Sequence, residues 1–186
     1  MTLKQIRLLQ LLDGQIGKCI DCNLYTNGRV KPYWTPDTKY VALGEAPGRD
    51  EVTLNEPFIG RAGDILWNNM TIPKKYFLVK NSVNCRPVVG NKNGKPTEEQ
   101  KFHCRKWRNK YIHVLAPRTI LLFGDHAIST MVPERGSVIA KNATMFYSVE
   151  FDADCIRSVH PAMSLYSPEK GTKLLKESIT LFDKIR

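Results

Sequence analysis

Residues 40–63 read YVALGEAPGRDEVTLNEPFIGRAG, and this stretch indicates the class of the fold. Its first part, Tyr40–Gly44, is a short apolar run that ends in glycine, as a buried parallel strand does. Two later runs, YFLVKNSV from Tyr76 and RTILLFG from Arg118, repeat this pattern. Because segments with helical character separate the three runs, we expect an α/β fold built on a parallel sheet.

Other patterns complete the expected architecture. Thr97 and Gln100 form a capping box that starts a helix reaching about Leu115. The segments MFYSVEF and CIRSVH are further strand candidates. Amphipathic patterns predict one helix in MTLKQIRLLQLLDGQ and another in SPEKGTKLLKESITLFDKI, the latter with Ser167 as its N-cap. The sequence has no internal repeat, so we expect a single domain over residues 1–186.

Composition restricts the class of protein. The 186 residues, 42% of them hydrophobic, are enough to bury one core. No run of about 18 apolar residues occurs, and charged residues interrupt the first amphipathic segment. We therefore expect a cytoplasmic protein, or one of the host cytoplasm if the source is a virus, that makes no membrane contact. We also expect a monomer, because no long apolar surface run stands out.

The charge balance suggests the kind of partner. The chain has 28 Lys and Arg residues against 18 Asp and Glu residues, a formal net charge of +10. Such an excess favours a polyanionic partner such as a nucleic acid. The alternative is a basic surface that is merely solvated.

The cysteines suggest a metal site. Cys19 and Cys22 form a Cys-x-x-Cys pair, Cys85 and Cys104 follow far downstream, and Cys155 is left over. In a reducing compartment, this pattern favours metal binding or catalysis over disulfides. Four thiolates could hold either zinc or an iron–sulfur cluster, and the spacing does not separate the two. The remaining alternative is a chance pair with two buried structural thiols.

Polar segments follow the expected strands. In open α/β sheets, ligands bind beyond the carboxyl ends of the strands. The segments there are GEAPGRDE, NSVNCRP, GDHAIST and VHPAMS, of which the last two contain His126 and His160. We therefore expect the functional groups to meet at this edge of the sheet.

The motifs in these segments resemble those of a known family. GEAPGRDEVTLNEPFIGRAG resembles the first motif of the family 4 uracil-DNA glycosylases, NSVNCRP is similar to the segment with their uracil-reading asparagine, and SVHPAMS resembles their second, His-Pro motif. The likeness covers nearly the whole chain. It implies a three-layer α/β/α fold with a central, mainly parallel four-stranded sheet. The implied activity is hydrolysis of the N-glycosidic bond of uracil in DNA, leaving an abasic site for base excision repair.

The resemblance also implies a cofactor. Cys19, Cys22, Cys85 and Cys104 fall where that family places the ligands of a 4Fe–4S cluster. The cluster is therefore favoured over zinc by the resemblance, and not by the spacing of the cysteines.

The resemblance assigns base contacts to Gly44, Ala46, Phe58 and Asn81. A glycosylase flips its target nucleotide out of the stack, reads the edge of the base and stacks the ring on an aromatic side chain. Gly44 would let the backbone approach the base, and Phe58 would be the stacking surface. The amide of Asn81 has one donor group and one acceptor group for O4 and N3–H of uracil. The structural alternatives are a core phenylalanine and a turn asparagine.

The catalytic roles implied are a donor and a carboxylate. His160 would donate a hydrogen bond to the departing uracil, and Glu45 or Glu51 would orient water and balance charge on the sugar. Val52 stands where this family often has an acid, so the role of the neighbouring Glu51 stays open. His126 is a weaker catalytic candidate.

Arg61, Arg86 and Arg157 lie in or near the motif segments, where they would contact phosphates of uracil-containing DNA, single- or double-stranded. Four rival functions remain: a protein that binds such DNA without cutting, a relative that bonds to it covalently, a glycosylase for another deaminated or 5-substituted base, and a metal-stapled nucleic-acid-binding domain with no catalysis. The covalent relatives carry an inserted basic loop before the fourth cysteine. The segment VVGNKNGKPTEEQKFHC has lysines and His103 but not that loop.

Overall fold

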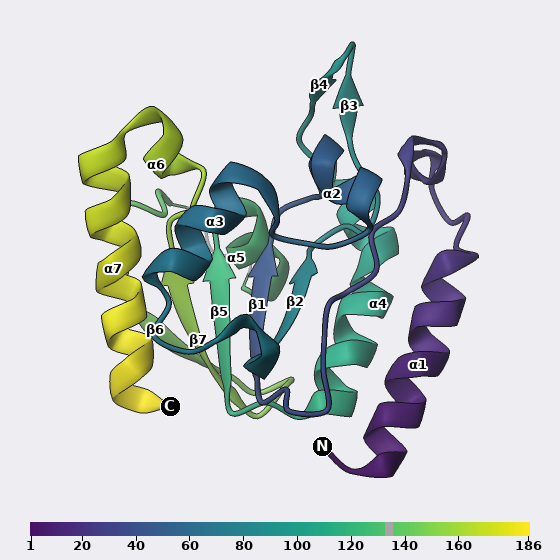
Figure 1. Cartoon of the computed structure of the whole chain (residues 1–186), viewed down its shortest axis with the longest axis horizontal. Coiled ribbons are helices and arrows are strands. Elements are labelled where there is room, and N and C mark those ends of the chain that lie inside the picture. Colours follow the sequence, from purple (N-terminus) through teal and green to yellow (C-terminus); the bar gives the residue numbers. More distant parts are fainter. Residues whose placement is uncertain (133–135) are drawn as a thin grey trace.

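A five-stranded sheet forms the centre of the molecule (Figure 1). The computed structural model describes residues 1–132 and 136–186. Four neighbouring strands run parallel, and the last strand in the order pairs antiparallel with its neighbour at one edge. The strand order is β2 (Phe77–Asn81), β1 (Tyr40–Gly44), β5 (Thr119–Phe123), β7 (Ala153–Ser158) and β6 (Met145–Ser148). The expected central, mainly parallel sheet is confirmed, but it has five strands and not four, because β6 adds one antiparallel edge strand.

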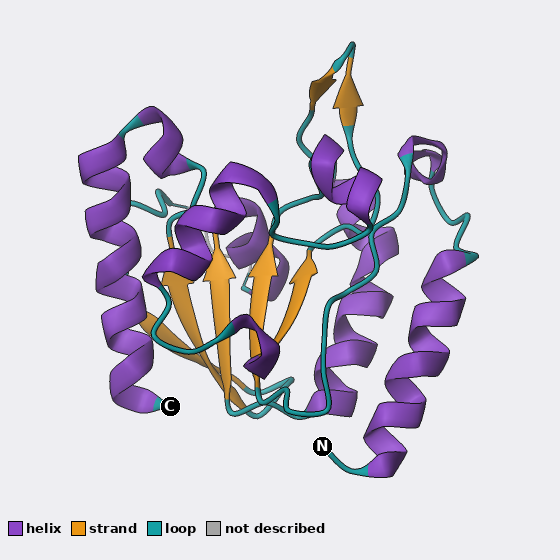
Figure 2. Ribbon diagram, in the orientation of Figure 1, coloured by secondary structure: helices purple, strands orange, loops and turns teal. Residues whose placement is uncertain are grey.

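Helices cover both faces of the sheet, which confirms the three-layer α/β/α architecture (Figure 2). On one face, residues of three helices pack with β1 and β5 into one core: α1 (Leu3–Gly17), α4 (Glu98–Leu115) and α5 (Asp125–Met131). On the other face, α3 (Gly60–Asn69) and α7 (Pro168–Ile185) pack with the same sheet into a second core. The short helix α6 (Met163–Tyr166) contacts α7.

The predicted helix ends agree with the structure. The backbone N–H of Gln100 donates to Thr97 Oγ1 over 3.2 Å, and the N–H of Thr97 donates to Gln100 Oε1 over 2.9 Å. This is the capping box expected from the sequence, and α4 ends at Leu115 as expected. Ser167 is the N-cap of α7, with Pro168 in its first turn, although the Ser167 side chain makes no capping hydrogen bond.

The remaining elements are short. α2 (Arg49–Leu54) follows β1, and the 3₁₀ helices η1 (Asn23–Asn27) and η2 (Lys74–Tyr76) lie in connecting segments. β3 (Val88–Val89) and β4 (Lys92–Asn93) form a small antiparallel hairpin that the sequence analysis did not anticipate.

None of the helices in the described residues is long and apolar enough to cross a membrane.

Candidate active site

Two neighbouring strands bring Gly44 and Asn81 together. Gly44 of β1 is the register partner of Asn81 of β2, at the carboxyl ends of both strands. A Cβ added to Gly44 would lie 2.4 Å from Cζ of Phe58 and 2.5 Å from Oδ1 of Asn81. No side chain larger than hydrogen fits there without moving both neighbours. The glycine predicted to allow close approach to the backbone is therefore required by the packing.

Phe58 is held in a left-handed backbone conformation. Its φ is 55°, which costs free energy for a residue with a side chain. Three contacts fix this conformation. The N–H of Phe58 donates to the carboxylate of Glu51, its carbonyl accepts from Trp67 Nε1 over 3.0 Å, and a Cβ on Gly63 would lie 2.1 Å from that carbonyl oxygen. The ring is thus set in place before any ligand binds, and it is 5% exposed.

Asn81 carries an unpaired polar group. Its side chain is 5% exposed. The amide lies close enough to the carboxylate of Glu51 to lower the pKa of that group, but within the described part of the chain Nδ2 makes no hydrogen bond of acceptable geometry. A buried polar group without a partner costs roughly 1–3 kcal/mol. An oxygen acceptor of a bound ligand would remove this cost.

His160 follows β7, far along the chain from Gly44 and Asn81, and its ring comes close to that of Phe58. The two ring centroids are 6.1 Å apart, with the planes tilted by 33°. A Cβ on Gly124 would lie 3.2 Å from Cβ of His160, so Gly124, with φ of 87°, makes room for this histidine. Gly44, Asn81, Phe58 and His160 form one chain of contacts, which we call the base cluster.

The protonation of His160 follows from its surroundings. The backbone N–H of Ala162 donates to Nδ1 of His160 over 3.2 Å. Burial, and to a lesser extent the charge of His126, lowers the pKa of His160 to about 4. The ring is therefore neutral near pH 7, with Nδ1 as an acceptor and the proton on Nε2. His160 is a neutral hydrogen-bond donor.

Glu51 uses both carboxylate oxygens on the backbone. One accepts from the N–H of Phe58 and the other from the N–H of Gly48, which closes the first turn of α2. Burial raises the pKa of Glu51, while these two N–H groups, the charge of Lys74 and the nearby amide of Asn81 oppose that rise. The next residue, Val52, packs against Gly28. Because both of its oxygens already accept backbone N–H groups, the Glu51 carboxylate is better placed to position Phe58 than to orient a water molecule.

Glu45 is the more accessible carboxylate. Its side chain is 25% exposed, and its Oε1 lies 3.5 Å from Nε2 of His126. The sequence analysis placed His126 as a weaker candidate and did not anticipate this pair. His126 also faces a cavity lined by both acidic and basic side chains, among them Asp125, Lys101 and Arg157.

The other predicted contacts differ in exposure. The side chain of Ala46 packs against the buried cluster of Leu24, Val83, Cys85 and Cys104. A contact between Ala46 and a base would therefore have to use its backbone N–H or carbonyl group. Arg61 is exposed in the first turn of α3, and Arg86 is partly exposed.

Arg157 is 6% exposed. Its guanidinium carbon lies 4.4 Å from the centre of the Phe146 ring, and its Nη1 donates to Thr144 Oγ1 over 3.2 Å. Arg157 therefore presents less surface to a phosphate than Arg61 or Arg86 does. The DNA contacts of all three arginines stay predictions.

The four predicted cysteine ligands meet. Cys19, Cys22, Cys85 and Cys104 line one narrow cavity beside η1, whereas Cys155 is 0% exposed within β7 and lies in the core of the sheet. Burial, followed by the nearby thiols, raises the pKa of Cys85 to about 12.

Among the described residues, no three Cys, His, Asp or Glu side chains are grouped as they would be around a single metal ion.

Sequence reasoning missed a buried cation next to these cysteines. Lys80 lies in β2, is 1% exposed, and donates from Nζ to Oδ1 of Asn84. Burial lowers the pKa of Lys80 to about 8, although the Cys104 thiol partly opposes this shift. A lysine inside the apolar run FLVKN was the available signal, because such positions normally hold apolar residues.

Comparison with known proteins gives these features a family context. The model of the uracil DNA glycosylase superfamily matches residues 32–182. The type-4 uracil-DNA glycosylase of Thermotoga maritima is 30% identical over 139 residues, which cover 72% of this chain and 71% of that protein. The enzyme of the same name from Sulfurisphaera tokodaii is 27% identical over 190 residues, which cover 96% of this chain and 83% of the relative. A third relative, from Saccharolobus solfataricus, is 25% identical over 92% of this chain and 87% of its own length.

Proposed function

This chain belongs to the uracil-DNA glycosylase superfamily, among relatives of type 4, and on that premise we propose that it removes uracil from DNA. The reaction is hydrolysis of the N-glycosidic bond, which leaves an abasic site. The proposal rests on the family and on the chemistry of the base cluster.

The unpaired amide of Asn81 is the observation that carries the proposal. Its Nδ2 is buried without a partner in the described residues, next to Gly44 and the ring of Phe58. Uracil has an acceptor at O4 and a donor at N3, and an amide side chain can pair with both. Cytosine has a donor at the position of O4 and would leave Nδ2 unpaired. The flipped base would stack on Phe58.

His160, as a neutral hydrogen-bond donor, can assist departure of the base. Negative charge develops on uracil as the glycosidic bond breaks, and a preorganised donor stabilises that charge. The Nε2–H group of His160 is such a donor, because Nδ1 is occupied by the N–H of Ala162.

For the carboxylate role, we propose Glu45. Its partly exposed side chain can reach water, which it would orient toward the sugar. The carboxylate of Glu51 is engaged by two backbone N–H groups and would position Phe58.

We also propose that Cys19, Cys22, Cys85 and Cys104 hold a 4Fe–4S cluster. The observation that supports it is the single cavity that all four thiols line. When bound, the cluster would tie η1, the end of β2 and the start of α4 together. The chemistry of base removal needs no electron transfer, so a structural role is sufficient.

A direct assay tests the proposed function. The protein is incubated with labelled oligonucleotides that carry one uracil, in single-stranded form and in duplexes, and the products are heated in alkali. We expect strand cleavage at the uracil and none in a matched oligonucleotide with thymine. A strand that is retarded on a gel but stays intact after alkali would favour a binding protein. Cleavage of a hypoxanthine substrate in preference to uracil would favour the rival base specificity.

A further inference from the structure

The β3–β4 hairpin stands beyond the carboxyl ends of the parallel strands (Figure 1). Residues 86–95, which we call the hairpin, contain one arginine and two lysines and no acidic residue, so they carry three positive charges. Lys92 and Lys95 are exposed, and neither has an ion-pair partner in the described parts of the chain. The base cluster lies at the same edge of the sheet.

The hairpin is fixed at its base. Nε of Arg86 donates to Oδ1 of Asn93 over 2.7 Å, and the N–H of Gly94 donates to the carbonyl of Pro87 over 2.9 Å. The N–H of Arg86 donates to the carbonyl of Gly28 over 3.2 Å. These bonds join the two strands and attach them to the segment after η1.

The hairpin also touches the loop that leads to Phe58. A Cβ on Gly48 would lie 3.3 Å from Nδ2 of Asn93, so β4 packs against the start of α2. The same turn holds Glu51, whose carboxylate binds the N–H groups of Gly48 and Phe58. The hairpin is therefore placed relative to the base cluster through short contacts and not through a long linker.

Resting on the proposed function, we propose that the hairpin binds the phosphate backbone of the DNA strand that flanks the flipped uracil. Lys92 and Lys95 would contact phosphates, and the Nη groups of Arg86 would contact a third one nearer the base. Such contacts hold the strand by charge and read no sequence. The nine residues from Ser82 to Gly90, which lead from the end of β2 to the tip of the hairpin, span at most about 31 Å, the rise of about nine nucleotides. The contacts should thus lie within about nine nucleotides of the uracil.

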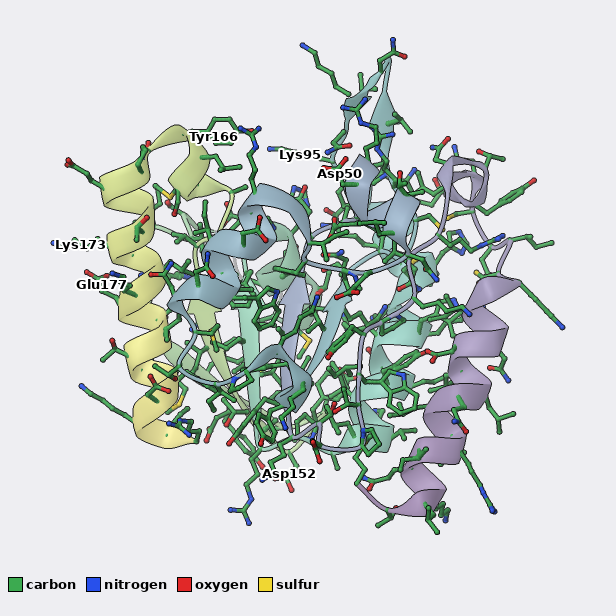
Figure 3. The ribbon with its side chains drawn as sticks, in the orientation of Figure 1. Asp50, Lys95, Asp152, Tyr166, Lys173 and Glu177 are labelled. Carbon is green, nitrogen blue, oxygen red and sulfur yellow. The ribbon has the colours of Figure 1, made fainter. Side chains whose placement is uncertain are left out.

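A pair of matched variants tests this proposal. Lys92→Ala/Lys95→Ala removes two charges from the hairpin, and Lys173→Ala/Lys176→Ala removes two charges from α7. Figure 3 shows that Lys173 points outward from α7, away from the hairpin. Both lysines of the control pair are exposed. The two double variants therefore have the same net charge and differ in where the charge was lost.

Binding is measured by fluorescence anisotropy at several salt concentrations. The probe is a single-stranded oligonucleotide with 2′-fluoro-2′-deoxyuridine, whose electron-withdrawing fluorine slows loss of the base. We expect the hairpin variant to bind about tenfold more weakly, with a salt slope lower by about 0.7 for each lost contact. The control should bind within about twofold of the wild type. The excision rate at saturating uracil-containing DNA should be unchanged in both.

Two outcomes overturn the proposal. Equal losses of affinity in the two variants would mean that only overall charge matters. A slower excision rate at saturating DNA, with affinity kept, would mean that the hairpin supports the base cluster and does not bind DNA. Failure of the proposed function looks different, because the wild type itself would then leave no alkali-sensitive site.

The position of the contacts is tested separately. Single phosphates in the probe are replaced by neutral methylphosphonates, one at a time. We expect one or more positions within about nine nucleotides of the uracil to weaken binding of the wild type but not of the hairpin variant. If every position weakens both proteins equally, the hairpin does not contact the backbone.

Discussion

The backbone N–H of Ala162 donates a hydrogen bond to Nδ1 of His160 over 3.2 Å. Pro161 stands between the two residues and limits the conformations of this turn. An imidazole nitrogen that accepts a hydrogen bond cannot also carry the proton, so Nε2 becomes the donor of the neutral ring. A hydrogen bond between residues two positions apart thereby determines which atom of His160 can donate to a ligand.

Replacing His160 with alanine should slow chemistry more than binding. We expect the single-turnover excision rate to fall by on the order of a hundredfold to a thousandfold, because the donor acts on charge present only in the transition state. Affinity for uracil-containing DNA and the thermal midpoint should change little. His113→Ala on α4 is the control and should leave the rate unchanged. A rate for His160→Ala within about twofold of the wild type, or ~0.4 kcal/mol in barrier, would mean that His160 is not the catalytic donor. His126 would then be the next residue to replace.

The titration of His160 gives a second prediction. Burial lowers its pKa to about 4, whereas a histidine in the unfolded chain titrates near 6.5. The folded protein therefore prefers the neutral ring, so its contribution to stability is complete above about pH 6.5 and is lost as the pH falls toward about 4. We expect the ¹⁵N resonances of this imidazole to show no transition between pH 5 and 8, assigned by comparison with His160→Ala. A transition near pH 6.5 would contradict a buried neutral ring.

A methyl group at Gly44 should close the base cluster. In Gly44→Ala, the new Cβ would lie 2.4 Å from Cζ of Phe58 and 2.5 Å from Oδ1 of Asn81, which forces one or both to move. We expect excision to be nearly abolished and preference for uracil-containing DNA to be lost. The matched control is Gly14→Ala, because a Cβ on Gly14 meets no atom within 4 Å. That change in α1 should raise stability by roughly 0.5–1 kcal/mol and keep activity. If Gly44→Ala kept full activity, the ring of Phe58 would not be held rigidly against Gly44.

Asn81→Asp should change the choice of base. A carboxyl group in place of the amide loses the donor that O4 of uracil needs, and a carboxylate oxygen can accept from N4 of cytosine. We therefore expect weaker excision of uracil and a small new activity on cytosine, measured on oligonucleotides that differ only in that base. Asn81→Ala should lose uracil excision without gaining cytosine. If Asn81→Ala excises uracil like the wild type, Asn81 makes no contact with the base.

The proposed cluster can be tested by measuring the iron, sulfide and zinc bound to the protein and to its cysteine variants. Purified protein should be brown, with iron and sulfide bound. Cys85→Ser should lower the iron content sharply and lower the thermal midpoint, because Cys85 lines the shared cavity. Cys155→Ser should keep the iron, because Cys155 lies in the core of the sheet. Colourless protein with stoichiometric zinc would contradict the cluster.

The parallel strands could be predicted because their sequence pattern is local. YVALG and TILLF are apolar runs of the length of a buried strand, and the capping box of Thr97 and Gln100 is read directly from three-residue spacing. The β3–β4 hairpin could not be predicted in this way. Its two-residue strands carry no alternation, and a hydrogen bond between Arg86 and Asn93 holds them together.

In the site, residue types were easier to predict than their partners. Asn81, Phe58 and His160 could be named because their segments resemble motifs of the family 4 uracil-DNA glycosylases. The sequence could not separate the two carboxylates, because the difference lies in through-space contacts: Glu51 binds the N–H of Phe58, whereas Glu45 lies near His126. The positive φ of Phe58 also depends on Glu51 and Trp67, which lie seven and nine residues away.

The cysteine cavity has a consequence for how the protein is made. Two of its thiols lie before residue 32, where the family match begins, and Cys104 lies in α4, which packs against α1. During translation the first pair leaves the ribosome long before Cys104 does, so loading of the proposed cluster could not finish until α4 has emerged. If the four thiols hold that cluster, a shortage of iron would leave the segment between α1 and β1 without its metal tie, while the strands still carry the whole base cluster. We would then expect protease cleavage between α1 and β1 to be faster in protein made without iron than in iron-loaded protein.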